Sequence, residues 1–498
     1  MSYLRSLRLR RLAPILAPLL LFATLTAWSL SSAVASSPDD DFHVASIWCG
    51  LGDRADLCED PEDGSTARLI PTPLTTATCF ARDYELSAAC WDPTVTGLSR
   101  AERANVDGLY PRLFYAAMAT MATTDIPTSV LTMRIVNSAF ATALLTLVFF
   151  ALPRRLRTPY VIGAGVAVVP LGLFVLASTN PSSWAYLSAA TVWITLYGAI
   201  QTTGKQRLLL ASLAVFGAVI GAGARADSAA YAVFGAGIAI VLSLRRSWRE
   251  LIFPAIVAAV ITAVAAAFYL GAKQGDAVVT GLSRERAALS PAKHVSNLLN
   301  IPELWRGAFG GWPLGWIDTP MPGIVPFLAF GVFCGTLFLG LRKTDWRKGF
   351  ALALAFLALV MVPFILLAQS HTVVGDLVQP RYILPLLVIA TGIGALGTTL
   401  RTEWNPLITT IVVASLSVAG GFALYFNMRR YTTGLDELGL VQVEWWWDAA
   451  PTPAIVLAIG VVAFTGLIAT LAVVGTDRPV SDAGESSRCT PSPRASAG

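Results

Sequence analysis

Long apolar stretches recur along the chain, each about as long as a bilayer-spanning helix. The hydrocarbon core of a bilayer is about 30 Å thick, and a helix needs about 20 apolar residues to cross it. Stretches of this kind occupy residues 12–34, 129–151, 160–178, 183–200, 207–224, 228–244, 251–270, 322–341, 349–368, 382–400, 406–426 and 453–474. The pattern predicts an all-α polytopic membrane protein with about twelve transmembrane helices.

Composition supports this reading and excludes a soluble globular protein. The 498 residues are 55% hydrophobic and only 13% charged, whereas a soluble chain carries roughly a quarter charged residues. We therefore expect one membrane-embedded body over residues 1–474 rather than several soluble domains. Residues 475–498 are rich in Ser, Pro and Arg and are expected to form a disordered cytoplasmic tail.

The first apolar stretch has features of a secretory signal peptide. A basic segment precedes it, and "SSAVASS" resembles a small-residue cleavage site. The apolar run over 12–34 is nevertheless longer than the roughly 7–15 residues of a signal-peptide core. We predict an uncleaved first span; cleavage would leave the topology of the remaining chain unchanged.

The basic residues in the short loops predict the orientation. Cytoplasmic loops carry an excess of Lys and Arg, and basic clusters fall on one side of the predicted topology at residues 5–11, 154–157, 205–207, 245–249, 342–348 and 401. Only Arg429 and Arg430 break the pattern. We expect a multi-pass protein of the plasma membrane with both termini in the cytoplasm.

Two long loops, 35–128 and 271–321, fall on the outer side. Residues 35–109 contain fourteen Asp and Glu but five Arg and no Lys. Four of the six cysteines also lie in this first loop, at Cys49, Cys58, Cys79 and Cys90. An even number of cysteines in an oxidising compartment predicts two disulfides, with three pairings open. Four free thiols are the alternative.

The segment "SSPDDDFH" follows the first span directly. If the chain turns helical at Pro38, Asp39 or Asp40 shares a face with His43. An acidic helix cap would account for the carboxylates. Three adjacent carboxylates repel one another, however, and such clusters favour raised pKa values or a metal ion. Asp39, Asp40, Asp41 and His43 are therefore candidate catalytic residues.

Three further outer segments carry candidate residues. "VDGLYPRLFYAAMAT" (106–120) is amphipathic and predicts an interfacial helix, in which Arg112 could reach a lipid phosphate or only snorkel. "STNPSSW" (178–184) is explained fully as a turn and helix cap. In "GARADSAAY" (223–231), Arg225 and Asp227 flank a tight hairpin near membrane depth. They either tie that hairpin or serve a function.

The second outer loop contains Trp305, Trp312 and Trp316 among Gly and Pro. Interfacial tryptophans are often membrane anchors. They are also suited to stack on a sugar or pack on a lipid, so Trp312 is a candidate substrate-binding residue. His294 and Glu303 are secondary candidates.

"VQPRYILP" opens the tenth predicted span with an arginine on the outer side. A helix N-terminus and the Arg381 guanidinium would together form an anion site suited to a phosphate. The planar guanidinium can bind two phosphate oxygens at once. Gln379 and Tyr382 flank this residue and are candidates with it. Interfacial snorkelling of Arg381 is the alternative.

At "SSPDDDFH" and "VQPRYILP" the chain resembles a bacterial family of multi-spanning membrane proteins of unknown function. That family has Pro-Asp-Glu followed by His after the first span and Gln-x-Arg-Tyr-x-x-Pro in a late one; "NPSSWAYLSAATVW" is similar to a third segment. The family in turn resembles the GT-C class of membrane glycosyltransferases. Here Asp replaces the usual Glu, and Asp41 is additional.

The resemblance implies a GT-C-like fold and an inverting transfer of sugar from a polyprenyl-phosphate donor to a cell-envelope glycan on the outer face. Its partners would be the lipid bilayer, that donor and the glycan acceptor, with no nucleic acid. Asp40 falls in the position of the catalytic base, and the extra carboxylates leave Asp39 and Asp41 as alternatives. Arg381 would stabilise the leaving phosphate, assisted by Arg225 or His43.

No cofactor is required by this reading, although Mg²⁺ or Mn²⁺ at Asp39, Asp40 and Asp41 is an open alternative. Two other classes of function compete with the enzyme. A transporter or flippase of lipid-linked sugars would use the same charges for binding only. A non-catalytic scaffold of envelope assembly would use the disulfide-bonded loop. Proximity of Asp40 and Arg381 would favour the enzyme.

Overall fold

The computed structural model describes residues 2–244, 247–276, 282, 286–397, 405–436, 439, 445–447 and 450–474. Within these ranges, eight helices are long and apolar enough to cross a bilayer. They are α1 (Ser2–Leu30), α5 (Ile126–Ala151), α9 (Gly204–Ala224), α11 (Trp248–Leu270), α14 (Ile324–Leu341), α15 (Trp346–Gln369), α17 (Pro406–Thr432) and α18 (Pro453–Val474). The predicted helical, polytopic membrane fold is confirmed.

The other four predicted spans are shorter, buried or broken. α10 (Ala226–Val241) and α16 (Leu384–Gly394) have 16 and 11 residues, fewer than the roughly 20 of a full span. The prediction of one helix over 160–178 is wrong. The chain forms α6 (Arg154–Val166) and α7 (Leu171–Leu176), separated at Pro170, which has no N–H to continue a helix. Twelve crossings therefore stay a prediction.

α8 (Ser182–Ile200) lies at the centre of the bundle. Of its 19 residues, all except Tyr197 are buried. The helix packs against α9, α10 and α16. A helix that is apolar on every side has no face to offer to water, so it occupies the interior. The hydroxyl of its first residue, Ser182, accepts from the Arg225 guanidinium at 3.3 Å.

The first outer loop folds as a small cross-linked unit. It contains α2 (Asp40–Trp48), α3 (Thr72–Thr76), the 3₁₀ turn η1 (Ala88–Cys90) and α4 (Arg112–Ala119). Strands β1 (Arg68–Pro71) and β2 (Leu98–Ala101) pair antiparallel. The two predicted disulfides are confirmed, with the pairings Cys49–Cys58 and Cys79–Cys90.

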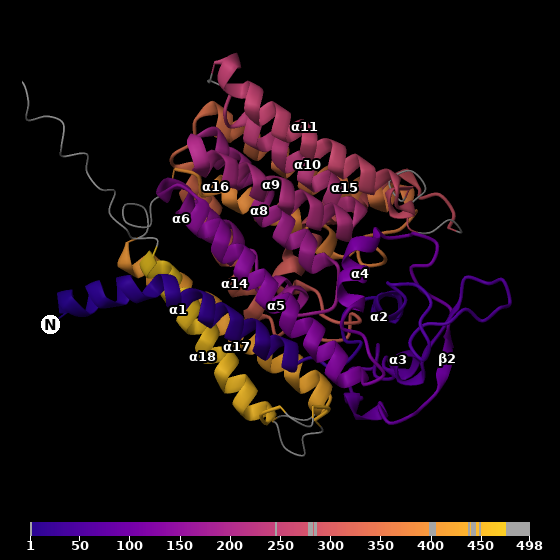
Figure 1. Ribbon diagram of the computed structural model, residues 1–498. Helices are drawn as coiled ribbons and strands as arrows, with labels where there is room; N and C mark the ends of the chain where they lie inside the picture. The colour runs from indigo at the N-terminus through magenta and orange to yellow at the C-terminus, as the bar shows by residue number, and fades with distance from the viewer. Residues whose placement is uncertain are drawn as a thin grey trace, which may run out of the picture.

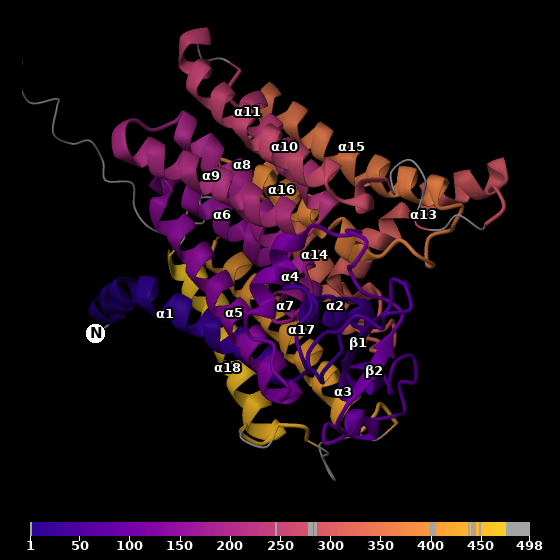
Figure 2. The same ribbon diagram turned by 45° about the vertical axis from the view of Figure 1, so that its right-hand side comes forward.

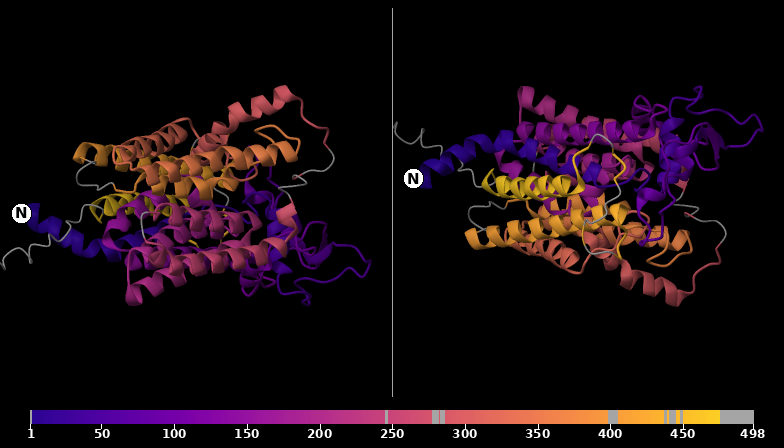
Figure 3. Two further views of the ribbon diagram at one scale, coloured as in Figure 1. Left: turned by 90° about the horizontal axis from the view of Figure 1, so that it is seen from above. Right: turned by 90° about the horizontal axis from the view of Figure 1, so that it is seen from below.

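Both large loops gather at one end of the helix bundle. Figure 1 shows α2, α3, β2 and α4 at the end opposite to the N-terminus. α13 (Pro291–Arg306), from the second loop, lies at this same end (Figure 2). The views from above and below agree (Figure 3). The remaining short elements are η2 (Lys273–Asp276), η3 (Gly307–Gly311) and η4 (Pro380–Tyr382).

A buried ion pair explains why Arg430 departs from the charge pattern. Its guanidinium lies 2.8 Å from the Asp318 carboxylate, and both side chains are buried. It also donates to the carbonyl oxygens of Phe80 and Leu86. Arg430 thus joins α17 to both outer loops and is a structural residue.

Loss of the Asp318 carboxylate should destabilise the protein strongly. Asp318→Ala would leave the buried Arg430 charge unpaired, at a cost of about 3–5 kcal/mol. Thermal unfolding of the purified protein in detergent should show a transition lower by several degrees. Asp63→Ala is the matched control, because Asp63 pairs with Arg100 where both side chains are well exposed. Equal shifts for the two variants would contradict a structural role for the Arg430 pair.

Several sequence predictions fall outside the described residues. They include the tail 475–498 and the basic residues Arg245, Arg246 and Arg401.

Candidate functional site

The strongest contact between the two predicted halves of the site is an ion pair. Asp39 precedes α2 and Arg381 lies in η4, more than 300 positions later, yet the Asp39 carboxylate accepts directly from the Arg381 guanidinium. Arg381 also donates to the carbonyl oxygen of Pro38 at 3.1 Å. The acidic segment after the first span and the segment before α16 therefore meet, as predicted.

Asp39 occupies an unusual backbone conformation. It has φ 60°, in the left-handed region, which Asp and Asn tolerate better than most residues do. Its side chain does not cap α2 and turns to Arg381 instead. Burial is the largest single influence and would raise its pKa, but the charge and the hydrogen bond of Arg381, together with His43 and Arg103, outweigh it and lower the pKa of Asp39 to about 2. Asp39 is thus an ionised partner of Arg381 and a weak base.

Asp40 lies in a different environment one residue later. Its side chain is fully buried. One carboxylate oxygen accepts from the backbone N–H of Ser37 at 2.9 Å, and the other has no hydrogen-bond partner among the described residues. Burial raises the pKa of Asp40 from 3.8 to about 7, against the opposing charge of Arg134. Such a carboxyl can take up a proton near neutral pH.

His43 shares the first turns of α2 with these carboxylates. Its Nδ1 lies 2.8 Å from the Tyr115 hydroxyl of α4, while its buried Nε2 has no partner in the described part of the chain. Burial, assisted by the Arg381 charge, lowers the pKa of His43 well below its usual range. The imidazole is therefore neutral at physiological pH and is not itself a source of positive charge.

Unpartnered polar atoms concentrate in this part of the structure. Buried side-chain atoms without a partner in the described ranges include Ser37 Oγ, Asp40 Oδ1, Asp41 Oδ1, His43 Nε2 and Arg381 Nε. Buried polar groups are normally hydrogen-bonded, and exceptions mark catalytic groups or places for water and ligands. The cluster has the unused donors and acceptors that a polar substrate requires.

A second arginine borders the cluster. The Arg225 guanidinium makes a two-fold contact with Asp227, at 2.9 and 2.7 Å. Its Cζ also lies 5.7 Å from the Tyr110 ring centroid and 5.2 Å from that of Tyr382. Arg381 stacks on the same Tyr382 ring at 5.3 Å. The predicted pair at the hairpin is confirmed, and the Tyr382 ring contacts both guanidinium groups.

The predicted helix N-terminus at Arg381 is wrong. Arg381 belongs to the three-residue turn η4, and α16 begins only at Leu384. Pro385 is the second residue of α16. The carbonyl oxygen of Tyr382, in η4, accepts from the Tyr231 hydroxyl at 2.7 Å. Positive charge at position 381 therefore comes from the guanidinium and not from the N-terminus of a helix that begins there.

The three carboxylates do not fit a shared metal site. Asp39 turns to Arg381, Asp40 to the Ser37 amide and Asp41 to Arg103, at 2.6 Å. Among the described residues, no group of three or more potential ligands converges. Guanidinium groups hold two of the carboxylates where a cation would need them free, so no step is assigned to Mg²⁺ or Mn²⁺.

The remaining candidates lie outside these contacts. Arg112 is exposed at the start of α4, and Gln379 precedes η4 with its side chain half-buried. Trp312 packs beside Gly307. The helix predicted within residues 106–120 is present as α4, whose Phe114 and Tyr115 are buried in protein; its location at the membrane interface stays a prediction. The helix packs on α2 and α9, so its aromatic residues support the site from within.

Sequence reasoning missed two residues of the site. Arg134 of α5 is fully buried and donates to the carbonyl oxygen of Ser29, in the last turn of α1, at 3.2 Å and to that of Ala33, just after α1, at 2.7 Å. Asn180 donates to the Pro38 carbonyl at 3.0 Å. A lone arginine in an apolar span was the available signal for Arg134. The turn at Asn180 is explained fully by local capping. Nothing in the sequence therefore indicated the contact of Asn180 with Pro38.

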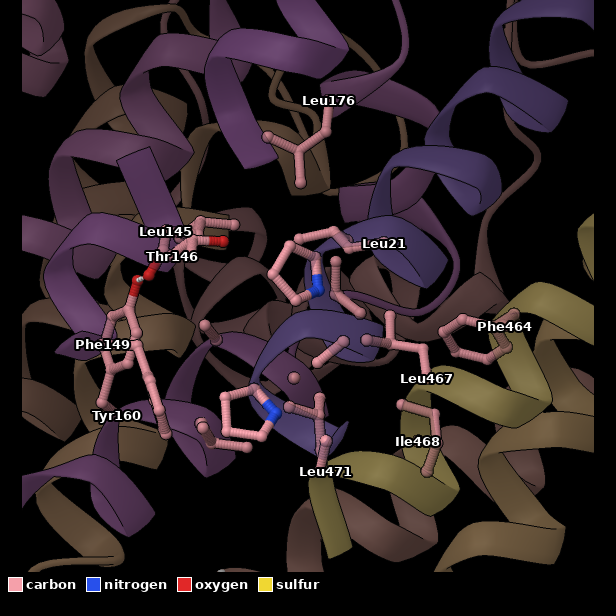
Figure 4. Close-up of a pocket in the computed structure, with 18 of the residues that line it drawn as sticks. Leu21, Leu145, Thr146, Phe149, Tyr160, Leu176, Phe464, Leu467, Ile468 and Leu471 are labelled. Carbon is pink, nitrogen blue, oxygen red and sulfur yellow. Dashed lines mark hydrogen bonds between the residues drawn. The ribbon is translucent and has the colours of Figure 1, made fainter. Parts of the chain in front are cut away.

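An apolar cavity of about 120 Å³ lies elsewhere, between α1, α5, α6 and α18. Figure 4 shows Leu21, Phe149, Leu467 and Ile468 directed into it. None of the described residues that line it is charged. Its apolar lining suits a hydrocarbon chain, and the described lining residues include no charged group that could act in catalysis.

Comparisons with known proteins agree with this architecture. No curated protein matches the chain. A family model described as "Predicted membrane protein (DUF2142)" matches residues 21–390, more than half of the 498 residues. This matched region contains the helix bundle around α8, both large outer loops and the Asp39–Arg381 contact, and the chain therefore belongs to the DUF2142 family of membrane proteins.

Proposed function

We propose that this protein is a GT-C-like membrane glycosyltransferase. It moves a sugar from a polyprenyl-phosphate donor to a glycan acceptor on the outer face of the plasma membrane, with both termini in the cytoplasm. The observation that carries the proposal is the ion pair between Asp39 and Arg381 beside the buried Asp40 carboxyl. A phosphate-binding cation and a carboxyl with a pKa near neutrality are the two groups that this reaction needs.

The Arg381 guanidinium is the proposed site for the donor phosphate. Its present partner, the Asp39 carboxylate, is an oxyanion of the kind that a phosphate would replace. Asp39 is about one-third exposed, whereas the Arg381 side chain is 1% exposed. An incoming lipid phosphate can thus displace the carboxylate towards solvent while the buried cation stays in place.

Asp40 is the proposed base. It removes the proton from the acceptor hydroxyl as that oxygen attacks the anomeric carbon of the donor sugar. The bond from this carbon to the phosphate oxygen breaks, and the electron pair leaves with the polyprenyl phosphate. The additional negative charge develops next to Arg381, which stabilises it. Attack from the face opposite to the leaving group inverts the anomeric configuration.

A transfer assay tests the proposal. The full-length protein in lipid nanodiscs is incubated with polyprenyl-phosphate sugars that differ in the sugar, together with neutral oligosaccharide acceptors. We expect release of polyprenyl phosphate and an acceptor longer by one sugar of inverted configuration. Binding of the donors without turnover over the whole set would favour a transporter or flippase instead.

The pH dependence of transfer should show one acidic limb. Asp40 must be deprotonated to act, and its pKa is raised to about 7. The apparent kcat/KM should therefore fall about tenfold for each pH unit below 7 and level off above it. Asp39, with a pKa lowered to about 2, and His43, with a pKa lowered well below its usual range, add no limb near pH 7. A limb centred near pH 4 would exclude Asp40 as the base.

A further inference from the structure

A second cavity, with a volume of about 480 Å³, lies at the end of the bundle that carries the first large loop. This is within the roughly 300–1,000 Å³ of small-molecule sites. Four of its lining residues are tryptophans: Trp91, Trp445, Trp446 and Trp447. The wall also includes Leu131 and Asp125, at the start of α5. The tryptophans proposed from the sequence of the second loop, Trp305, Trp312 and Trp316, do not line this cavity.

The indole groups divide into structural and unused donors. Trp91 donates to the Pro73 carbonyl at 2.8 Å, and Trp447 donates to the Leu30 carbonyl at 2.9 Å. These bonds fix two sides of the cavity. The buried N–H groups of Trp445 and Trp446 have no acceptor among the described residues. An unused buried donor is costly unless a ligand or water accepts from it.

The charge of the cavity selects the class of ligand. Asp125 is the charged residue among the described residues that line it, and neither Lys nor Arg is present there. An anionic lipid headgroup would meet a carboxylate without a cation to balance it. A neutral polyhydroxylated molecule can donate to Asp125, accept from the indole N–H groups and stack its apolar face on the rings.

The Tyr431 side chain connects the cavity to the segment that carries the proposed reaction centre. The Tyr431 ring contacts Trp446, with centroids 6.3 Å apart. The Tyr431 hydroxyl donates to the Ser36 carbonyl at 3.3 Å, three residues before Asp39. One side chain thus links the tryptophan wall to the acidic segment.

We propose that this cavity binds an uncharged saccharide unit of a glycan. Its identification with the acceptor glycan rests on the proposed function, whereas saccharide binding itself does not. Arg381, which pairs with Asp39, and Arg225, which pairs with Asp227, would hold the phosphate of the donor. The tryptophan cavity would hold the neutral glycan that receives the sugar.

Glycan binding by the full-length protein tests this site. The protein, in nanodiscs of phosphatidylcholine, is applied to an array of neutral oligosaccharides, and the affinity for the strongest binder is then measured by calorimetry. Trp445→Phe keeps an aromatic ring, smaller than the indole, but removes the N–H, and should weaken binding about two- to tenfold. Asp125→Asn keeps a residue that caps helices well but removes the charge, and should weaken binding about tenfold.

Replacing both free indoles, as Trp445→Ala/Trp446→Ala, should weaken binding about thirtyfold or more. Trp346→Phe is the matched control, because Trp346 is exposed at the start of α15, away from the cavity. The binding assay contains no lipid-linked donor, so it measures glycan binding without transfer and separates this site from the proposed catalysis. Binding that is unaffected by the cavity variants, or no binding to any neutral glycan, would overturn the proposal.

Discussion

Asp40→Asn should reduce sugar transfer by about 10²–10⁴-fold, the range that a general base contributes. Asparagine has almost the same shape as aspartate, and its amide oxygen can still accept from the Ser37 amide. It cannot take up the proton of the acceptor hydroxyl. Initial rates with saturating donor and acceptor measure the effect, with Asp63→Asn in the exposed Asp63–Arg100 pair as the control.

The same substitution should stabilise the fold. The pKa of Asp40 is raised in the folded protein from 3.8 to about 7. Its stabilising contribution is therefore present below pH 4 and lost as the pH rises through 7. Asp40→Asn should unfold at a higher temperature than the wild type at pH 8, and the difference should shrink at pH 4.5. An active, less stable variant would show that Asp40 is a structural residue.

Arg381→Gln should reduce transfer by about 10²–10³-fold, as expected when a group that stabilises developing charge is removed. Arg381→Lys retains the charge but loses the planar fork that binds two phosphate oxygens. It should recover only part of the rate. Steady-state kinetics with a polyprenyl-phosphate sugar measure both variants.

Arg100→Gln is the control for these arginine variants. Arg100 lies in the same outer loop as Asp39 and pairs with Asp63 and Glu102 near the surface, so its loss should leave the transfer rate unchanged. If Arg381→Lys were as active as the wild type, bidentate phosphate binding would be excluded. If Arg381→Gln were as active, the leaving phosphate would lie elsewhere.

The membrane fold was largely predictable because apolar length and charge bias act locally along the chain. The two disulfides followed from cysteine number and compartment, although their pairing depends on how the loop folds. The break before α7 was missed because a proline inside a long apolar run leaves the hydropathy unchanged. The short α16 was missed because apolar length does not show where a helix begins.

Some residues of the candidate site were predictable, but Arg134, Asn180 and the pairings between the charged groups were not. Charges beside membrane spans are rare enough to identify Asp39, Asp40 and Arg381 from sequence. Which carboxylate pairs with Arg381 depends on the left-handed turn at Asp39, a tertiary feature. The environment of Asp40 depends on Arg134, whose partners are backbone carbonyls and have no sequence signature.

Binding of polyprenyl phosphate alone tests the central claim most directly, namely that the lipid phosphate binds Arg381 in place of the Asp39 carboxylate. Asparagine tolerates the left-handed conformation at position 39, so Asp39→Asn removes the competing carboxylate without disturbing the turn. Calorimetry in nanodiscs should show tighter binding to Asp39→Asn than to the wild type, and weaker binding to Arg381→Gln. Equal affinities for all three proteins would contradict the claim.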